Sequence, residues 1–157
     1  MLRSCTRAIR ARCQMDKSTF FESVARRAGC DERRAEGLTF AVFQELRDRL
    51  TRGEAADVDA QLPTGLKPLW EFLDRPDRHV RKVHEPQFIG EVRLIASLPD
   101  DVEAERAVVA VFATLQELLG SPTGIEGEAW DVMSQLPKDL KKLWFGAHQR
   151  VAEFGRI

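Results

Sequence analysis

The sequence predicts an all-α fold: a tandem repeat of two four-helix units that together form one compact helical domain. The first observation is an internal repeat, because Gly53 to Trp70 (GEAADVDAQLPTGLKPLW) and Gly127 to Trp144 (GEAWDVMSQLPKDLKKLW) agree at 12 of 18 positions without a gap. The second is a set of helix caps followed by apolar residues at intervals of three and four. The third is that no segment alternates apolar and polar residues as a strand does. Since a unit of about 55 residues buries little surface alone, we expect the two units to share one core.

The first unit, residues 15–74, opens with two predicted helices. Thr19 and Glu22 have the spacing of a capping box, so a helix is expected to begin there and to stop at Gly29. Asp31 is placed to cap the second helix, whose apolar residues recur at helical spacing. Its apolar residues are Leu38, Phe40, Val42, Phe43, Leu46 and Leu50, and the residues predicted to face solvent are Arg33, Arg34, Glu45, Arg47 and Asp48.

Two shorter helices complete the first unit. One runs from Glu54 to about Gln61, and the next starts at Pro63, where the missing N–H of proline does no harm. The second unit, residues 86–157, repeats this order, except that Arg93 to Ser97 replaces the Ala-Gly stop, so its first helix is expected to end differently. Its helices carry Phe88, Val92 and Ile95; then Ala104 to Leu119 behind a cap of Asp100 and Glu103; then Trp130 and Met133; then Leu140, Leu143, Trp144 and Phe145.

Two basic segments lie outside these units. Residues 1–14 form a leader with four Arg and no acid. Either translation starts later, at Met15, or the leader is a disordered basic tail, and a nucleic-acid-binding arm is the third alternative. Residues 75–85 form a basic linker between the units.

Composition limits the possible classes of function. The chain has 24 Lys and Arg against 25 Asp and Glu, and removing the leader leaves 20 basic against 25 acidic residues, which argues against a nucleic-acid partner. No apolar run approaches the roughly 18 residues of a membrane span, so no membrane contact is expected. The three cysteines include no Cys-x-x-Cys pair, which indicates neither a disulfide framework nor a zinc site and fits a reducing cytoplasm.

The motifs of the repeat resemble a known family. Phe-x-x-x-Val-Ala-x-x-Ala-Gly at Phe20 to Gly29, and Gly-Glu-Ala-x-Asp-Val-x-x-Gln-Leu-Pro-x-x-Leu-Lys at Gly53 to Lys67, are similar to the bacterial family of domain of unknown function 2267. The chain resembles two tandem copies of that helical repeat over about Lys17 to Val151, and its most specific element is Gln-Leu-Pro. The resemblance implies a small, all-helical, cytosolic bacterial protein without an established catalytic residue.

No arrangement of residues predicts a catalytic, metal or cofactor site. His79 and His84 are five residues apart, which turns them to different faces of a helix. His148 stands apart from them and is expected at the surface or in an interface. Cys30 precedes a helix, but the acids beside it oppose a thiolate. We therefore predict that the protein is not an enzyme and needs no cofactor.

Two hypotheses for the function remain. The first is a noncatalytic helical module, regulatory or stress-related, that contacts an unknown protein partner or associates with itself. The alternative is a nucleic-acid-associated protein whose phosphate contacts come from the leader and from four linker residues, Arg75, Arg78, Arg81 and Lys82. The residues of the repeat signature are predicted to be structural: Gln61, Leu62, Pro63, Trp70, Gln135, Leu136, Pro137 and Trp144.

Overall fold

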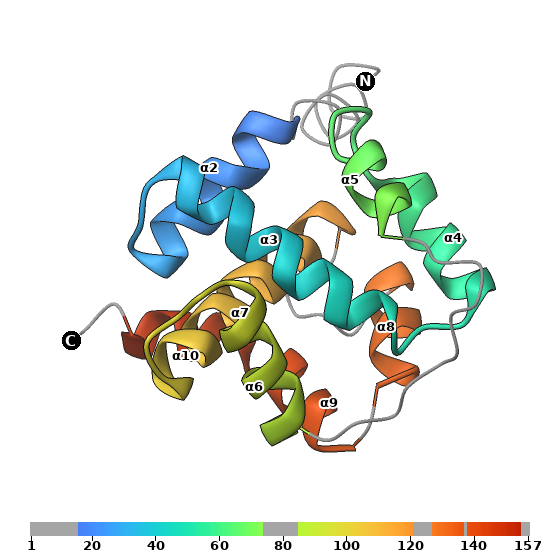
Figure 1. The fold of residues 1–157 in the computed structure, drawn as a ribbon. Coiled ribbons are helices and arrows are strands. Elements are labelled where there is room, and N and C mark those ends of the chain that lie inside the picture. Colours follow the sequence, from blue (N-terminus) through green and yellow to red (C-terminus); the bar gives the residue numbers. More distant parts are fainter. Residues whose placement is uncertain (1–15, 74–84, 121–126, 137, 155–157) are drawn as a thin grey trace, which may run out of the picture.

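The computed structural model describes residues 16–73, 85–120, 127–136 and 138–154, and within these ranges every regular element is an α-helix (Figure 1). The predicted all-α class is therefore confirmed. The leader, residues 1–14, and the linker up to residue 84 lie outside the described residues, so the predicted unit boundaries stay predictions. The helices are α2 (Lys17–Ala28), α3 (Glu32–Arg47), α4 (Arg52–Gln61), α5 (Lys67–Phe72), α6 (Glu85–Ile95), α7 (Asp101–Leu118), α8 (Gly127–Ser134), α9 (Lys138–Phe145) and α10 (Ala147–Phe154).

Aspartate side chains cap three of the helices. The carboxylates of Asp31 and Asp100 each accept a hydrogen bond from the backbone N–H three residues later, at 2.7 and 2.9 Å, as predicted. The prediction for α2 was wrong, because its cap is Asp16, which accepts the N–H of Thr19 at 2.8 Å. Thr19 therefore lies inside the first turn of α2 rather than at its start.

The last helices of both halves differ from the prediction. α5 begins at Lys67 rather than at Pro63, because Pro63 opens a turn in which its carbonyl accepts the N–H groups of Leu66 and Lys67, at 2.9 and 3.2 Å. A further helix, α10, follows α9 and was not predicted. It places three apolar residues against the core: Ala147, Val151 and Phe154.

The first helix of each half ends in the same left-handed turn, although the sequence predicted different ends. Gly29, after α2, has a φ of +70°, and Ser97, after α6, has a φ of +54°. In both turns the next residue donates its N–H to the carbonyl five residues before it, at 3.0 and 2.9 Å. Ser97 is the one non-glycine residue with positive φ in the described ranges, so these hydrogen bonds hold the turn without glycine.

A central phenylalanine on each long helix contacts two other buried aromatic rings. The ring centre of Phe43 on α3 lies 5.8 and 5.2 Å from those of its neighbours. The ring centre of Phe112 on α7 lies 5.9 and 5.0 Å from those of its own. The two halves thus have matching aromatic contacts, although their description as a tandem repeat of four-helix units stays a prediction. The outer rings are Phe20 and Trp70 in the first half and Phe88 and Trp144 in the second.

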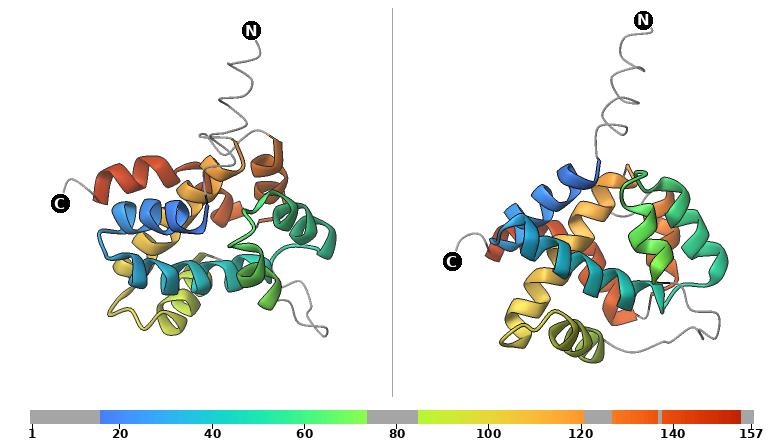
Figure 2. Two further views of the ribbon diagram at one scale, coloured as in Figure 1. Left: turned by 90° about the horizontal axis from the view of Figure 1, so that it is seen from above. Right: turned by 45° about the horizontal axis from the view of Figure 1, so that its top comes forward.

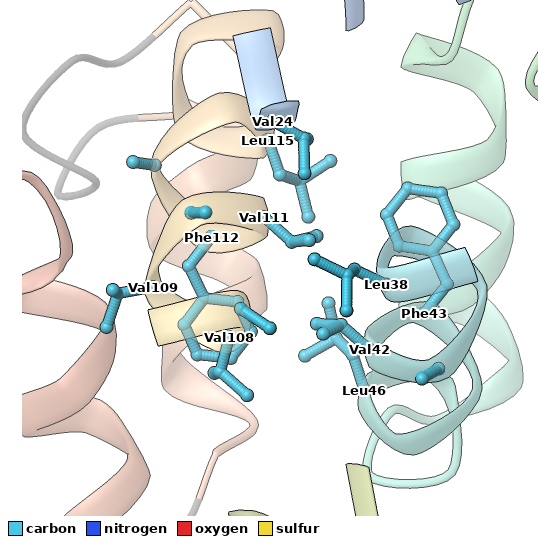
Figure 3. Packing of buried hydrophobic residues seen from close by; sticks show 14 of the residues in the cluster. Val24, Leu38, Val42, Phe43, Leu46, Val108, Val109, Val111, Phe112 and Leu115 are labelled. Carbon is cyan, nitrogen blue, oxygen red and sulfur yellow. The ribbon is translucent and has the colours of Figure 1, made fainter. Parts of the chain in front are cut away.

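The two halves interlock through α3 and α7. α2 and α6 each pack on both long helices, α10 packs on α7, and α4 lies beside α8 (Figures 1 and 2). At the centre, Leu38 and Val42 of α3 point toward α7, where Val108 and Val111 meet them (Figure 3). The buried apolar residues of both halves therefore form one continuous cluster.

Candidate functional site

The residues of the repeat signature lie mainly in the core. Trp70 and Trp144 are fully buried. The indole N–H of Trp70 donates to the carbonyl of Ala55 at 2.9 Å, which ties α5 to α4. Both tryptophans are therefore part of the buried core. Of the other signature residues, Leu62 and Leu136 are buried, Pro63 and Gln135 are half-buried, Gln61 is exposed, and Pro137 lies outside the described residues.

The described residues include two side chains of possible chemical reactivity, Cys30 and His148, and burial shifts the pKa of each. Burial, followed by the charge of Asp31, raises the pKa of the Cys30 thiol, which disfavours a nucleophilic thiolate. His148 is half-buried, and burial, followed by the charge of Arg27, lowers its pKa. The residues predicted as phosphate contacts, Arg75, Arg78, Arg81 and Lys82, lie outside the described residues, as do His79 and His84.

The C-terminal end of α3 carries buried charged residues. The sequence predicted that three of them would face solvent. Glu45, Arg47 and Asp48 are buried, and the neighbouring Arg49 is buried completely. The prediction was wrong because α5 and α6 pack on α3. The periodicity of α3 alone does not show which other helices bury its polar side. Earlier in the same helix, Arg33 and Arg34 are exposed as predicted, together with their acidic neighbour Glu32.

Arg49 is the centre of this charge cluster. Its Nη1 donates to Oε2 of Glu45 at 2.8 Å, and its Nη2 lies 3.9 Å from Oε2 of Glu91 on α6. The guanidinium also lies 4.9 Å from the ring centre of Phe88 on α6. Burial, followed by a hydrogen bond with Glu91, raises the pKa of Glu45 to about 7, although Arg49 lowers it. The cluster thus joins α3 to α6 and contains a carboxyl group that titrates near neutral pH.

A second buried polar contact is repeated in the two halves. Arg47 on α3 donates to the carbonyl of Trp70 at 3.1 Å, and Gln116 on α7 donates to the carbonyl of Trp144 at 2.7 Å. The guanidinium of Arg47 also lies 5.1 Å from the ring centre of Trp70. Because each side chain satisfies a carbonyl near the end of a short helix, these groups stabilise the joint between that helix and the long helix.

Aromatic side chains are exposed on α8 and α9, which pack against each other. Trp130 and Phe145 are each 47% exposed. When the two repeats are aligned, they correspond to Ala56 and Glu71, which line one hollow on the surface of the first half. Trp130 and Phe145 thus occupy the aligned positions of the second half, on two helices that pack against each other, and we call this surface the α8–α9 face. Other exposed apolar residues are Phe72, Leu94 and Val102.

Neither a metal centre nor a bilayer-spanning helix is found in the part of the chain that the structure describes. No three side chains of His, Cys, Asp or Glu there are grouped to hold a metal ion. No helix in those ranges is both long and apolar enough to cross a bilayer. The carboxyl pair of Glu45 and Glu91 has Arg49 as its counter-charge.

Comparison with known proteins identifies the family of the chain. No curated protein matches the chain. The family model that matches covers residues 17–143 and is described as an uncharacterized conserved protein (DUF2267). Its match begins with α2 and includes both copies of the Gln-Leu-Pro signature, Gln61 to Pro63 and Gln135 to Pro137. The chain therefore belongs to this family of uncharacterized conserved proteins, DUF2267.

Proposed function

We propose that this protein is a noncatalytic helical module that contacts another protein through the α8–α9 face. The observation that carries the proposal is the pair of half-exposed aromatic side chains, Trp130 and Phe145, on adjoining helices. Tryptophan and phenylalanine are enriched at the centres of protein interfaces, and tryptophan is prominent among the residues that dominate binding energy. A partner that covers both rings would remove their apolar surface from water.

The difference between the two halves supports this proposal. The first half carries Ala56 and Glu71 at the aligned positions, and both are exposed. The fold therefore does not need aromatic rings there. Since Trp130 and Phe145 are not required to fill the core, contact with a partner is the best account of their exposure.

The buried polar groups favour a noncatalytic role. Arg49 and Gln116 contact neighbouring helices, and the raised pKa of Cys30 disfavours attack by its thiol. A regulatory or stress-related role and a cytoplasmic location belong to the same proposal. The location is supported by the cysteine content of the sequence, which lacks a disulfide framework.

Affinity capture from a lysate of the host tests the proposal. The full chain is compared with the variant Trp130→Ala/Phe145→Glu, which places the first-half residues in the second half. Phe72→Ser is the matched control, because Phe72 on α5 is also an aromatic residue, with 76% of its surface exposed. We expect the double variant to lose proteins that the wild type and the control retain. Equal retention by all three proteins would contradict the proposal.

A further inference from the structure

We propose that the partner of the α8–α9 face is a second copy of this chain, bound about a twofold axis. This inference rests on the proposed function and names the partner. It depends on the charged residues that border Trp130 and Phe145.

One border of the α8–α9 face is basic. Lys138 and Lys141 precede Phe145 by seven and four residues, which places the three residues on one side of α9. Lys138 is exposed and Lys141 is half-buried. This side of α9 therefore combines an aromatic ring with two positive charges.

Another border is acidic. α8 packs against α4, and Asp131 on α8 and Asp57 on α4 are both exposed. After burial, the charges of Asp131 and Asp57 are the causes that raise the pKa of Glu54 on α4. These three carboxyl groups therefore lie close enough to interact, and together they place negative charge where α4 meets α8.

A face with an aromatic centre, a basic border and an acidic border is complementary to itself. In a twofold interface both copies use the same patch, so the basic border of one copy meets the acidic border of the other. The aromatic rings of the two copies then pack near the axis and lose their contact with water. A nucleic acid would be repelled by the acidic border, and a protein of uniform charge would match one border only. A second copy satisfies both borders and the centre.

Sedimentation velocity of the full chain from about 1 μM to about 1 mM tests the proposal. We expect a monomer–dimer equilibrium that weakens as salt is added. The variant Trp130→Ala/Phe145→Glu should raise the Kd of the dimer by at least about tenfold. Phe72→Ser should leave the Kd unchanged, and circular dichroism of each variant verifies its helix content.

Charge reversal tests the role of the borders. Lys138→Glu/Lys141→Glu gives a chain with two acidic borders, and Asp57→Lys/Asp131→Lys gives a chain with two basic borders. Each variant alone should dimerise more weakly than the wild type, because like charges then face each other. An equimolar mixture of the two should form a heterodimer, since each border then meets its opposite.

Two outcomes would overturn the inference. The first is a chain that stays monomeric at every concentration. In that case a host protein lost by the Trp130 and Phe145 variant would still support the proposed function, so the two failures are distinguishable. The second is a dimer whose Kd does not respond to any of these variants, because its interface would then lie elsewhere.

Discussion

Replacing Ser97 with glycine should stabilise the protein, because Ser97 has a backbone conformation that L-residues disfavour, with a φ of +54°. The left-handed region costs an L-residue about 1–2 kcal/mol, and the greater freedom of glycine in the unfolded chain offsets about 0.4–1 kcal/mol of the gain. We therefore expect the free energy of unfolding of Ser97→Gly to rise by about 0.5–1 kcal/mol. For a chain of this length, the melting temperature should rise by about 1–4 °C.

The neighbouring contacts of Ser97 remain possible in the variant. Its side chain is exposed, and its carbonyl, which accepts Nη2 of Arg34 at 3.3 Å, is unchanged by the substitution. The hydrogen bond from the N–H of Leu98 to the carbonyl of Arg93, at 2.9 Å, is also a backbone contact. The expected gain is therefore the backbone term alone.

The aligned position in the first half provides the reverse experiment. Gly29 has a φ of +70°, a conformation that serine disfavours, and a Cβ there would also meet the guanidinium of Arg106. Gly29→Ser should therefore destabilise the fold by about 1–3 kcal/mol. Ser97→Ala, which keeps the backbone cost, should stay within about 0.5 kcal/mol of the wild type. Urea unfolding followed by circular dichroism measures all three variants, and a Ser97→Gly protein no more stable than the wild type would refute the reasoning.

Two further predictions concern the core and use the same unfolding assay. The pKa of Glu45 is raised in the fold from 4.5 to about 7, so between these values the folded protein retains a proton that the unfolded chain has released. The stability that this proton contributes is fully present below about pH 4.5 and is lost by about pH 7, a fall of up to about 3 kcal/mol. Glu45→Gln should reduce that slope, and equal slopes in the two proteins would contradict the assignment. Trp70→Ala and Trp144→Ala should each cost about 3–5 kcal/mol, and a loss below about 1 kcal/mol would be incompatible with full burial.

Local signals predicted the helices because they act over a few residues. Asp31 and Asp100 cap the helices that follow them, and the spacing of apolar residues identified α3 and α7. The burial of Glu45 and Arg49 could not be predicted in this way, since it depends on α6, which lies about 40 residues further along the chain and supplies Glu91.

The turn at Ser97 shows a different limit of local signals. Glycine is the usual residue for a left-handed helix end, so its absence predicted another conformation. The structure keeps the turn at a cost in backbone energy, because the following chain must reverse direction to bring α7 against α6. A preference of about 1 kcal/mol at one residue is smaller than the apolar burial that the packing of two helices provides.

The positions at which the two halves agree or differ indicate where function should be sought. Trp70 and Trp144 agree, are buried, and accept matching hydrogen bonds at their carbonyl groups. The aligned pairs Ala56 with Trp130 and Glu71 with Phe145 differ in chemistry, and all four residues are exposed. An exposed aromatic ring adds little to the packing of its own core, so its effect on free energy is largest when another surface covers it. The charges beside the rings then restrict which surface can do so, and a second copy of the same face meets both the basic and the acidic border.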